Sequence, residues 1–193
     1  MGNILGAYIS PHPPIIVEEI GRGETTKAKN TVRGVERIGE DIKGKSPSTI
    51  ILITPHGPLF SDAISISCEE ELWGDFANFG YGNLQFEFKN NIPLVDSIRT
   101  KAGKRGIAIA SIDREFAKDY GVSIKVDHGA LVPLYFVNKY YEDYKLVHIT
   151  YGLLSPLELY EFGKVIQESV LESQGDVVLI ASGDLSHRLS TDG

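Results

Sequence analysis

Residues 50–60 read IILITPHGPLF, an apolar run that ends in a histidine held between a proline and a glycine. The run has the pattern of a buried strand, and the PHGP that follows it cannot continue the strand. His56 is therefore expected in the turn directly after a strand. Three more histidines occupy similar turns: His12 in AYISPHPPI, His128 in IKVDHGALVPL and His187 in VVLIASGDLSHRL.

The composition predicts a soluble protein with a single domain. With 193 residues, 42% of them hydrophobic, the chain can bury a core as one domain covering residues 1–193. No apolar run approaches the roughly 18 residues of a membrane span. The start, MGNILGAYI, lacks the basic flank and cleavage site of a secretory signal. We therefore expect no membrane partner.

The charge and the cysteine count narrow the classes of function. A net charge of −7 and a pI near 5.2 would repel nucleic-acid phosphates, so no nucleic-acid partner is expected. The single cysteine, Cys68, excludes an internal disulfide and a cysteine-rich zinc site, and it fits a reducing cytoplasm. Histidines and carboxylates must supply any metal ligands. We expect a cytoplasmic protein with a small-molecule or protein partner, and a homo-oligomer stays open.

Apolar runs that alternate with helical patterns predict an α/β domain. The expected strands are Ile4–Ile9, Thr49–Ile53, Ala63–Ser67, Leu84–Phe88, Ile107–Ile112, Lys145–Thr150 and Val177–Ala181. The expected helices cover about 25–43, a segment starting near Pro93, about 129–140 and about 155–174. The last helix has the clearest start, because Ser155 and Glu158 match a capping box around Pro156. This alternation predicts a central mixed or mostly parallel sheet flanked by helices on both faces.

Residues 63–88 have the pattern of a hairpin-like insertion, with short strands on either side of GDFANFGYGN. This region is rich in aromatic residues: Trp73, Phe76, Phe79 and Tyr81. They would form either a lid or pocket wall, or a satellite hydrophobic cluster. The sequence does not separate these two interpretations.

The histidine turns are expected to meet at one edge of the sheet. Loops that follow parallel strands converge at the carboxyl ends of those strands, where α/β proteins bind ligands. The prolines and glycines beside the rings would restrict the backbone and hold the imidazoles at fixed angles. Asp127 and Asp184 would either orient these rings as hydrogen-bond acceptors or stabilise their own turns. His148, inside the run KLVHITYG, is expected to be a buried, hydrogen-bonded strand residue.

The stretches SPHPP, TPHGP, VDHGALVPL and SGDLSHRL, in this order, resemble the signature stretches of the LigB family of class III extradiol dioxygenases, which includes Memo-like proteins. The resemblance covers essentially the whole chain. It is closest to the LigB-like N-terminal domain of proteins that also carry an AMMECR-type domain. The resemblance implies an Fe(II) centre, with zinc or another divalent metal as alternatives, that cleaves a catechol-like substrate with O₂. It implies that His12 and His56 are metal ligands, that His187 is the acid/base residue, and that His128 contacts substrate or oxygen.

The chain departs from this pattern in its carboxylate ligand. In ring-cleaving members that ligand lies well beyond the SHxL-type motif, whereas this chain ends at Gly193. We expect either that the chain is truncated, which we favour, or that one of Glu18, Glu19, Asp184 and His187 completes the ligand set. In the truncated case, catechol cleavage would be slow or absent. Two other functions stay open: a Memo-like metal-binding or partner-binding domain without ring cleavage, and a zinc hydrolase.

Overall fold

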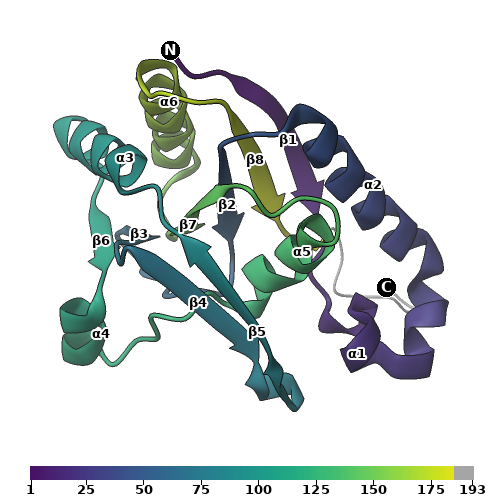
Figure 1. The fold of residues 1–193 in the computed structure, drawn as a ribbon. Helices are drawn as coiled ribbons and strands as arrows, with labels where there is room; N and C mark the ends of the chain where they lie inside the picture. Colours follow the sequence, from purple (N-terminus) through teal and green to yellow (C-terminus); the bar gives the residue numbers. More distant parts are fainter. Residues whose placement is uncertain (185–193) are drawn as a thin grey trace.

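The computed structural model describes residues 1–184, and a six-stranded sheet runs through its centre (Figure 1). The strands in spatial order are β1 (Ile4–Ser10), β8 (Val177–Ser182), β2 (Thr49–Thr54), β7 (Lys145–Thr150), β3 (Ile64–Ser67) and β6 (Ile109–Ile112). Neighbouring strands are parallel except for β3, which pairs with β7 antiparallel. This confirms the predicted mostly parallel sheet and places the ends of β1, β8 and β2 side by side.

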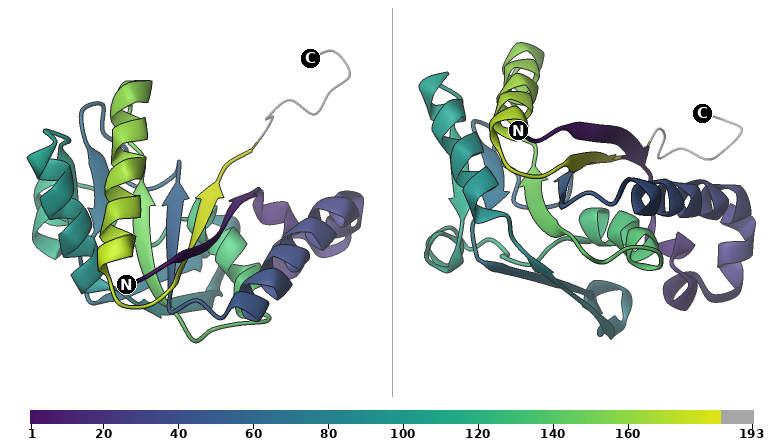
Figure 2. Two further views of the ribbon diagram at one scale, coloured as in Figure 1. Left: turned by 90° about the horizontal axis from the view of Figure 1, so that it is seen from above. Right: turned by 45° about the horizontal axis from the view of Figure 1, so that its top comes forward.

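Helices cover both faces of the sheet, as predicted (Figure 2). The helices are α1 (Glu18–Gly21), α2 (Lys29–Lys45), α3 (Ile92–Lys104), α4 (Arg114–Tyr120), α5 (His128–Asn138) and α6 (Pro156–Glu172). Successive side chains of a strand point to opposite faces, and this alternation divides the core into two clusters. Ile50 and Leu52 pack with α2 and α5, whereas Ile51 packs with α3 and α6.

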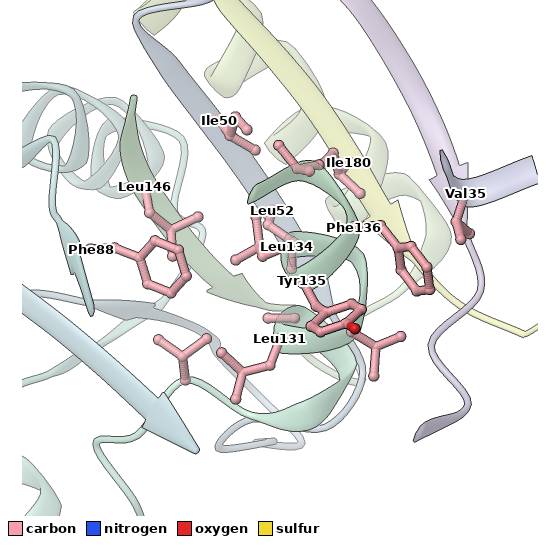
Figure 3. Packing of buried hydrophobic residues seen from close by; sticks show 14 of the residues in the cluster. Val35, Ile50, Leu52, Phe88, Leu131, Leu134, Tyr135, Phe136, Leu146 and Ile180 are labelled. Carbon is pink, nitrogen blue, oxygen red and sulfur yellow. The ribbon is translucent and has the colours of Figure 1, made fainter. Parts of the chain in front are cut away.

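The cluster around α5 packs this helix, whose first residue is His128, against the strands (Figure 3). Leu131 and Leu134 of α5 are fully buried against the strands, together with Leu52 and Ile180. Helix α5 is apolar on all sides because it lies between the sheet, α2 and the hairpin described below. Its start, and the residues there, are therefore fixed relative to the strand ends.

The helix boundaries follow local signals. Ser155 and Glu158 form the predicted capping box at the start of α6. Helix α4 was not expected, although Asp113 caps its start and Gly121, with a φ of 65°, ends it. It is only 7 residues long, too short for a clear apolar period.

A two-stranded hairpin of β4 (Glu71–Phe76) and β5 (Tyr81–Lys89), joined by the short 3-10 helix η3 (Ala77–Phe79), packs beside the main sheet. The hairpin itself was expected, but the assignment of its first strand was wrong. The strand expected at 63–67 belongs to the main sheet as β3, and β4 takes its place in the hairpin. Gly74 weakens the strand signal of β4, yet it is required there, because a Cβ would lie 2.5 Å from the Val126 carbonyl oxygen.

None of the helices between residues 1 and 184 has the length and apolar character needed to cross a lipid bilayer.

Candidate functional site

Three histidines meet at the carboxyl edge of the sheet, as the turn pattern predicted. His12 lies just beyond the end of β1, His56 just beyond the end of β2, and His128 is the first residue of α5. One ring nitrogen from each lies within 4.8 Å of the others. His12 is buried, His56 is exposed and His128 is half-buried, so the cluster opens to solvent on one side. His187, the fourth histidine of the pattern, lies outside the described residues.

Ser182, the last residue of β8, fixes the orientation of the His12 ring. Its Oγ lies 2.9 Å from His12 Nδ1 and donates its proton to the carbonyl oxygen of Gly129. A hydroxyl has one proton to donate, so Ser182 must accept from His12, and Nδ1 carries the ring proton. The Nε2 of a neutral His12 therefore presents a lone pair, which is the form that binds a metal.

His12 and His56 point their Nε2 atoms at each other across 2.9 Å, with their rings nearly perpendicular at 85°. Two nitrogens held about 2.0–2.1 Å from one ion at a right angle lie about 3 Å apart. The pair thus has the separation of two neighbouring ligands of one ion. Together with the His12 lone pair, this geometry fits a divalent metal bound between the two rings.

His128 lies against this pair on the side of the pocket. Its ring centroid is 4.3 Å from that of His56 and 5.9 Å from that of His12. Burial lowers the pKa of His128, and the neighbouring His56 lowers it further, because a second positive charge is disfavoured there. The ring therefore stays neutral to lower pH and can accept a proton.

The carboxylates expected to complete the ligand set differ in how close they lie to the histidines. Within residues 1–184, the side chains whose potential ligand atoms lie within 4.8 Å of one another are His12, His56 and His128. Asp184 approaches this group, with Oδ2 3.7 Å from His12 Nε2. Glu19 instead accepts a hydrogen bond of 2.9 Å from Tyr135, and Glu18 lines a separate groove beside α2.

Asp127 stabilises its own turn, which is one of the two roles that the sequence left open, and the ring that it holds is that of His148 rather than one of the turn histidines. It caps α5 by accepting a hydrogen bond from the Ala130 N–H, so it stabilises its own turn. It also accepts hydrogen bonds from Thr54 at 2.7 Å and from His148 at 2.9 Å. Burial alone would raise the pKa of Asp127, but the bonds from His148 and Thr54 outweigh it and lower the pKa to about 2. His148 is buried and hydrogen-bonded within β7, as expected.

A pocket of about 450 Å³ opens beside His56 and His128. The tip of the hairpin forms one wall, where Phe79 stands edge-on to His128 with centroids 5.1 Å apart. Phe76, in contrast, is fully buried in the core. The pocket-wall interpretation therefore holds for Phe79, whereas Phe76 belongs to the main core rather than to a satellite cluster. Lys125 also lines the pocket, paired with Asp75 at 2.8 Å.

Sequence reasoning missed the hydroxyls that support the site. Ser182 and Thr54 each end a strand, in IAS and LIT, and each contacts a partner far away along the chain. A polar residue that closes an apolar strand immediately before a histidine or aspartate turn was the available signal. By itself this signal also fits a residue that only ends its strand.

The chain is similar to known proteins over most of its length. A family model described as the catalytic LigB subunit of aromatic ring-opening dioxygenase matches residues 6–193. The chain is 48% identical over 188 residues to Protein CA_C1420 of Clostridium acetobutylicum, in a match that covers 97% of this chain and 40% of that protein. It is 23% identical over 202 residues to 3,4-dihydroxyphenylacetate 2,3-dioxygenase of Escherichia coli, covering 100% of this chain and 69% of that enzyme. The chain thus spans less than half the length of the Clostridium relative.

Proposed function

We propose that this chain, which belongs to the LigB family of aromatic ring-opening dioxygenases, forms a non-haem Fe(II) site for extradiol cleavage of a catechol-like substrate with O₂. The observation that carries the proposal is the 2.9 Å approach of His12 Nε2 to His56 Nε2 beside a pocket large enough for an aromatic ring. The distant Escherichia coli relative, named as a 2,3-dioxygenase of 3,4-dihydroxyphenylacetate, supports the same reaction type.

His12 and His56 would hold the iron. Bound Fe(II) supplies a centre at which a catechol and O₂ can both bind while electrons pass between them. Ser182 keeps His12 in the tautomer that presents its lone pair, and the Pro-His-Pro and Pro-His-Gly turns restrict the backbone that carries the two rings. Within residues 1–184, the carboxylate placed to add negative charge to this centre is that of Asp184, whose Oδ2 lies 3.7 Å from His12 Nε2.

His128 and the pocket wall would act on the substrate. The neutral His128 ring lies where a substrate hydroxyl would enter, so it can accept the proton that the catechol loses on binding. Phe79 offers an aromatic face to the substrate ring and excludes water from that side of the pocket. By the resemblance, His187 would return the proton to the product.

The test is ring cleavage itself. The chain is loaded with Fe(II) without oxygen, exposed to O₂ with a panel of catechols, and followed by O₂ uptake and by the yellow ring-fission product. A form extended past Gly193 is assayed in parallel, because the family pattern expects its carboxylate ligand there. The expected result is product from the extended form that depends on iron and is lost in its His12→Ala and His56→Ala variants, with slow or no product from the chain that ends at Gly193. Full iron occupancy in both forms with no product from any catechol would overturn the proposal.

A second candidate function is metal binding without ring cleavage, in the manner of Memo-like relatives. The observation in its favour is that, in the described part of the chain, no carboxylate joins the three-histidine group. Zinc suits such a ligand set as well as iron does. Metal analysis of the protein as purified distinguishes the two functions, because stoichiometric zinc together with failed cleavage supports the second.

A further inference from the structure

The carboxylate of Asp127 connects two of the histidine-bearing segments. Its Oδ1 accepts a 2.7 Å hydrogen bond from Thr54 Oγ1, and the same Oγ1 accepts the backbone N–H of His56 at 3.2 Å. Asp127 also caps α5, the helix whose first residue is His128. A displacement of this carboxylate would therefore move both His56 and His128.

The other oxygen of Asp127 is held from inside the sheet. Oδ2 accepts a hydrogen bond from His148 Nε2 at 2.9 Å, and His148 Nδ1 lies 2.8 Å from Ser67 Oγ. A carboxylate can only accept, so His148 carries a proton on Nε2. His148 is 2% exposed, in the middle of β7, and its ring cannot turn without disturbing the strand. The fixed His148 ring therefore holds the Asp127 carboxylate in place.

Two glycines close the space around these groups. A Cβ at Gly129 would lie 2.6 Å from Thr54 Oγ1 and 3.0 Å from His56 Cδ2. A Cβ at Gly57 would lie 2.0 Å from Thr150 Oγ1 and 3.4 Å from Asp127 Oδ2. The residues that follow His56 and His128 thus pack directly against the hydrogen-bonded groups. The two histidine turns have little room to shift independently of Asp127.

We infer that Asp127 and His148 form a buried positioning pair that sets the relative orientation of His56 and His128. The inference rests on the proposed metal site. Neither residue of the pair is assigned as a ligand; they act through Thr54 and the start of α5. Loss of such outer partners typically weakens metal binding by about 10–100-fold, because the ligand rings lose their fixed angles. No sequence signal assigned His148 a role beyond its strand.

The experiment measures Co(II) binding and the visible absorption of the bound ion, which reports ligand geometry directly. Thr54→Val keeps the side-chain shape but removes the hydroxyl, and His148→Gln removes the imidazole ring that donates to Asp127. We expect about tenfold weaker Co(II) binding and a shifted spectrum in each variant. Asp127→Asn can still accept from Thr54, so its Co(II) affinity and spectrum should be closer to those of the unaltered protein than the values of Asp127→Ala are.

Ile98→Ala is the matched control for general destabilisation. Ile98 is fully buried on the opposite face of the sheet, in the cluster around α3 and α6, so its truncation lowers stability without touching the pair. Its Co(II) affinity and spectrum should be unchanged. Unchanged affinity and spectrum in both Thr54→Val and His148→Gln would overturn the positioning pair.

A metal-free measurement separates this inference from the proposed function. If the unaltered protein fails to bind Co(II), the proposed metal site is wrong. The pair is then judged from the imidazole nitrogen NMR shifts of the metal-free protein. Asp127→Ala should move the signals of both His56 and His128, and Ile98→Ala should move neither. Constant histidine signals in Asp127→Ala would overturn the pair.

Discussion

His12 and His56 are 44 positions apart in the sequence, and their Nε2 atoms lie 2.9 Å apart at the carboxyl edge of the sheet. The contact arises because β1 and β2 both pair with β8 in parallel, which brings the turns after them to the same edge. A His-Pro turn follows one strand and a His-Gly turn follows the other. The sheet order therefore converts a repeated local pattern into one site.

The first prediction concerns metal content. The His12→Ala, His56→Ala double variant should lose at least 90% of bound divalent metal, about a tenfold drop, because two of the proposed ligands are gone. Metal content is measured by elemental analysis after equilibration with Fe(II) or Zn(II), with circular dichroism to confirm folding. Tyr120→Ala, on the exposed end of α4, serves as the control and should keep its metal. A folded double variant with stoichiometric metal would show that the ligands lie elsewhere.

The second prediction separates His128 from the ligand pair. His128→Gln should keep metal affinity within about tenfold, because the proposed ligands His12 and His56 remain. Catechol turnover by the form extended past Gly193 should fall by about 10²-fold or more, because the group that accepts the substrate proton is lost. Metal titration and ring-fission assays on the same preparation give both values. Complete loss of metal would instead identify His128 as the third ligand, which its place in the three-histidine group allows.

Much of this site was predictable from the sequence, because short local patterns of residues specify it. Apolar strands, turn residues and the rule that parallel strands end at one edge were sufficient to bring His12, His56 and His128 together. The capping box at Ser155 likewise defined the start of α6. The roles of these histidines, with that of His187, remain proposals.

The supporting contacts were not predictable, because they depend on the sheet order. Ser182 reaches His12 across 170 positions only because β8 lies between β1 and β2. Thr54 reaches Asp127 across 73 positions because α5 begins at the end of β2. No local pattern specifies such neighbours. The pairing of β4 with β5 was hidden for a related reason, since Gly74 is retained for its close approach to Val126 rather than for strand propensity.

The third prediction tests the tautomer of His12. Ser182→Ala removes the acceptor of the Nδ1 proton, so both neutral tautomers become populated and metal affinity should fall by about tenfold. Ser182→Thr retains the hydroxyl and should bind metal within about threefold of the unaltered protein. Competition with a chelator gives the affinities, and nitrogen-detected NMR of the metal-free protein gives the tautomer. A His12 ring that keeps its proton on Nδ1 in Ser182→Ala would contradict this assignment.

The fourth prediction follows from the lowered pKa of Asp127. Its pKa is about 2 in the folded protein, whereas an unfolded aspartate titrates near 3.9. Between these values the unfolded chain binds more protons, so the stability from this carboxylate rises with pH and is complete above about pH 4. It is lost as the pH falls through about 2, and it amounts to about 2 to 3 kcal/mol of unfolding free energy.

Urea unfolding of the metal-free protein between pH 6 and pH 2 measures this contribution. The difference in unfolding free energy between the unaltered protein and Asp127→Asn should be constant from pH 6 to about pH 4 and should shrink below it, because the protonated carboxyl and the amide are both neutral. Asp62→Asn, at an exposed position in the loop after β2, is the control and should show no such change. A difference that stays constant down to pH 2 would mean that the Asp127 carboxylate is not held in its charged form by His148 and Thr54.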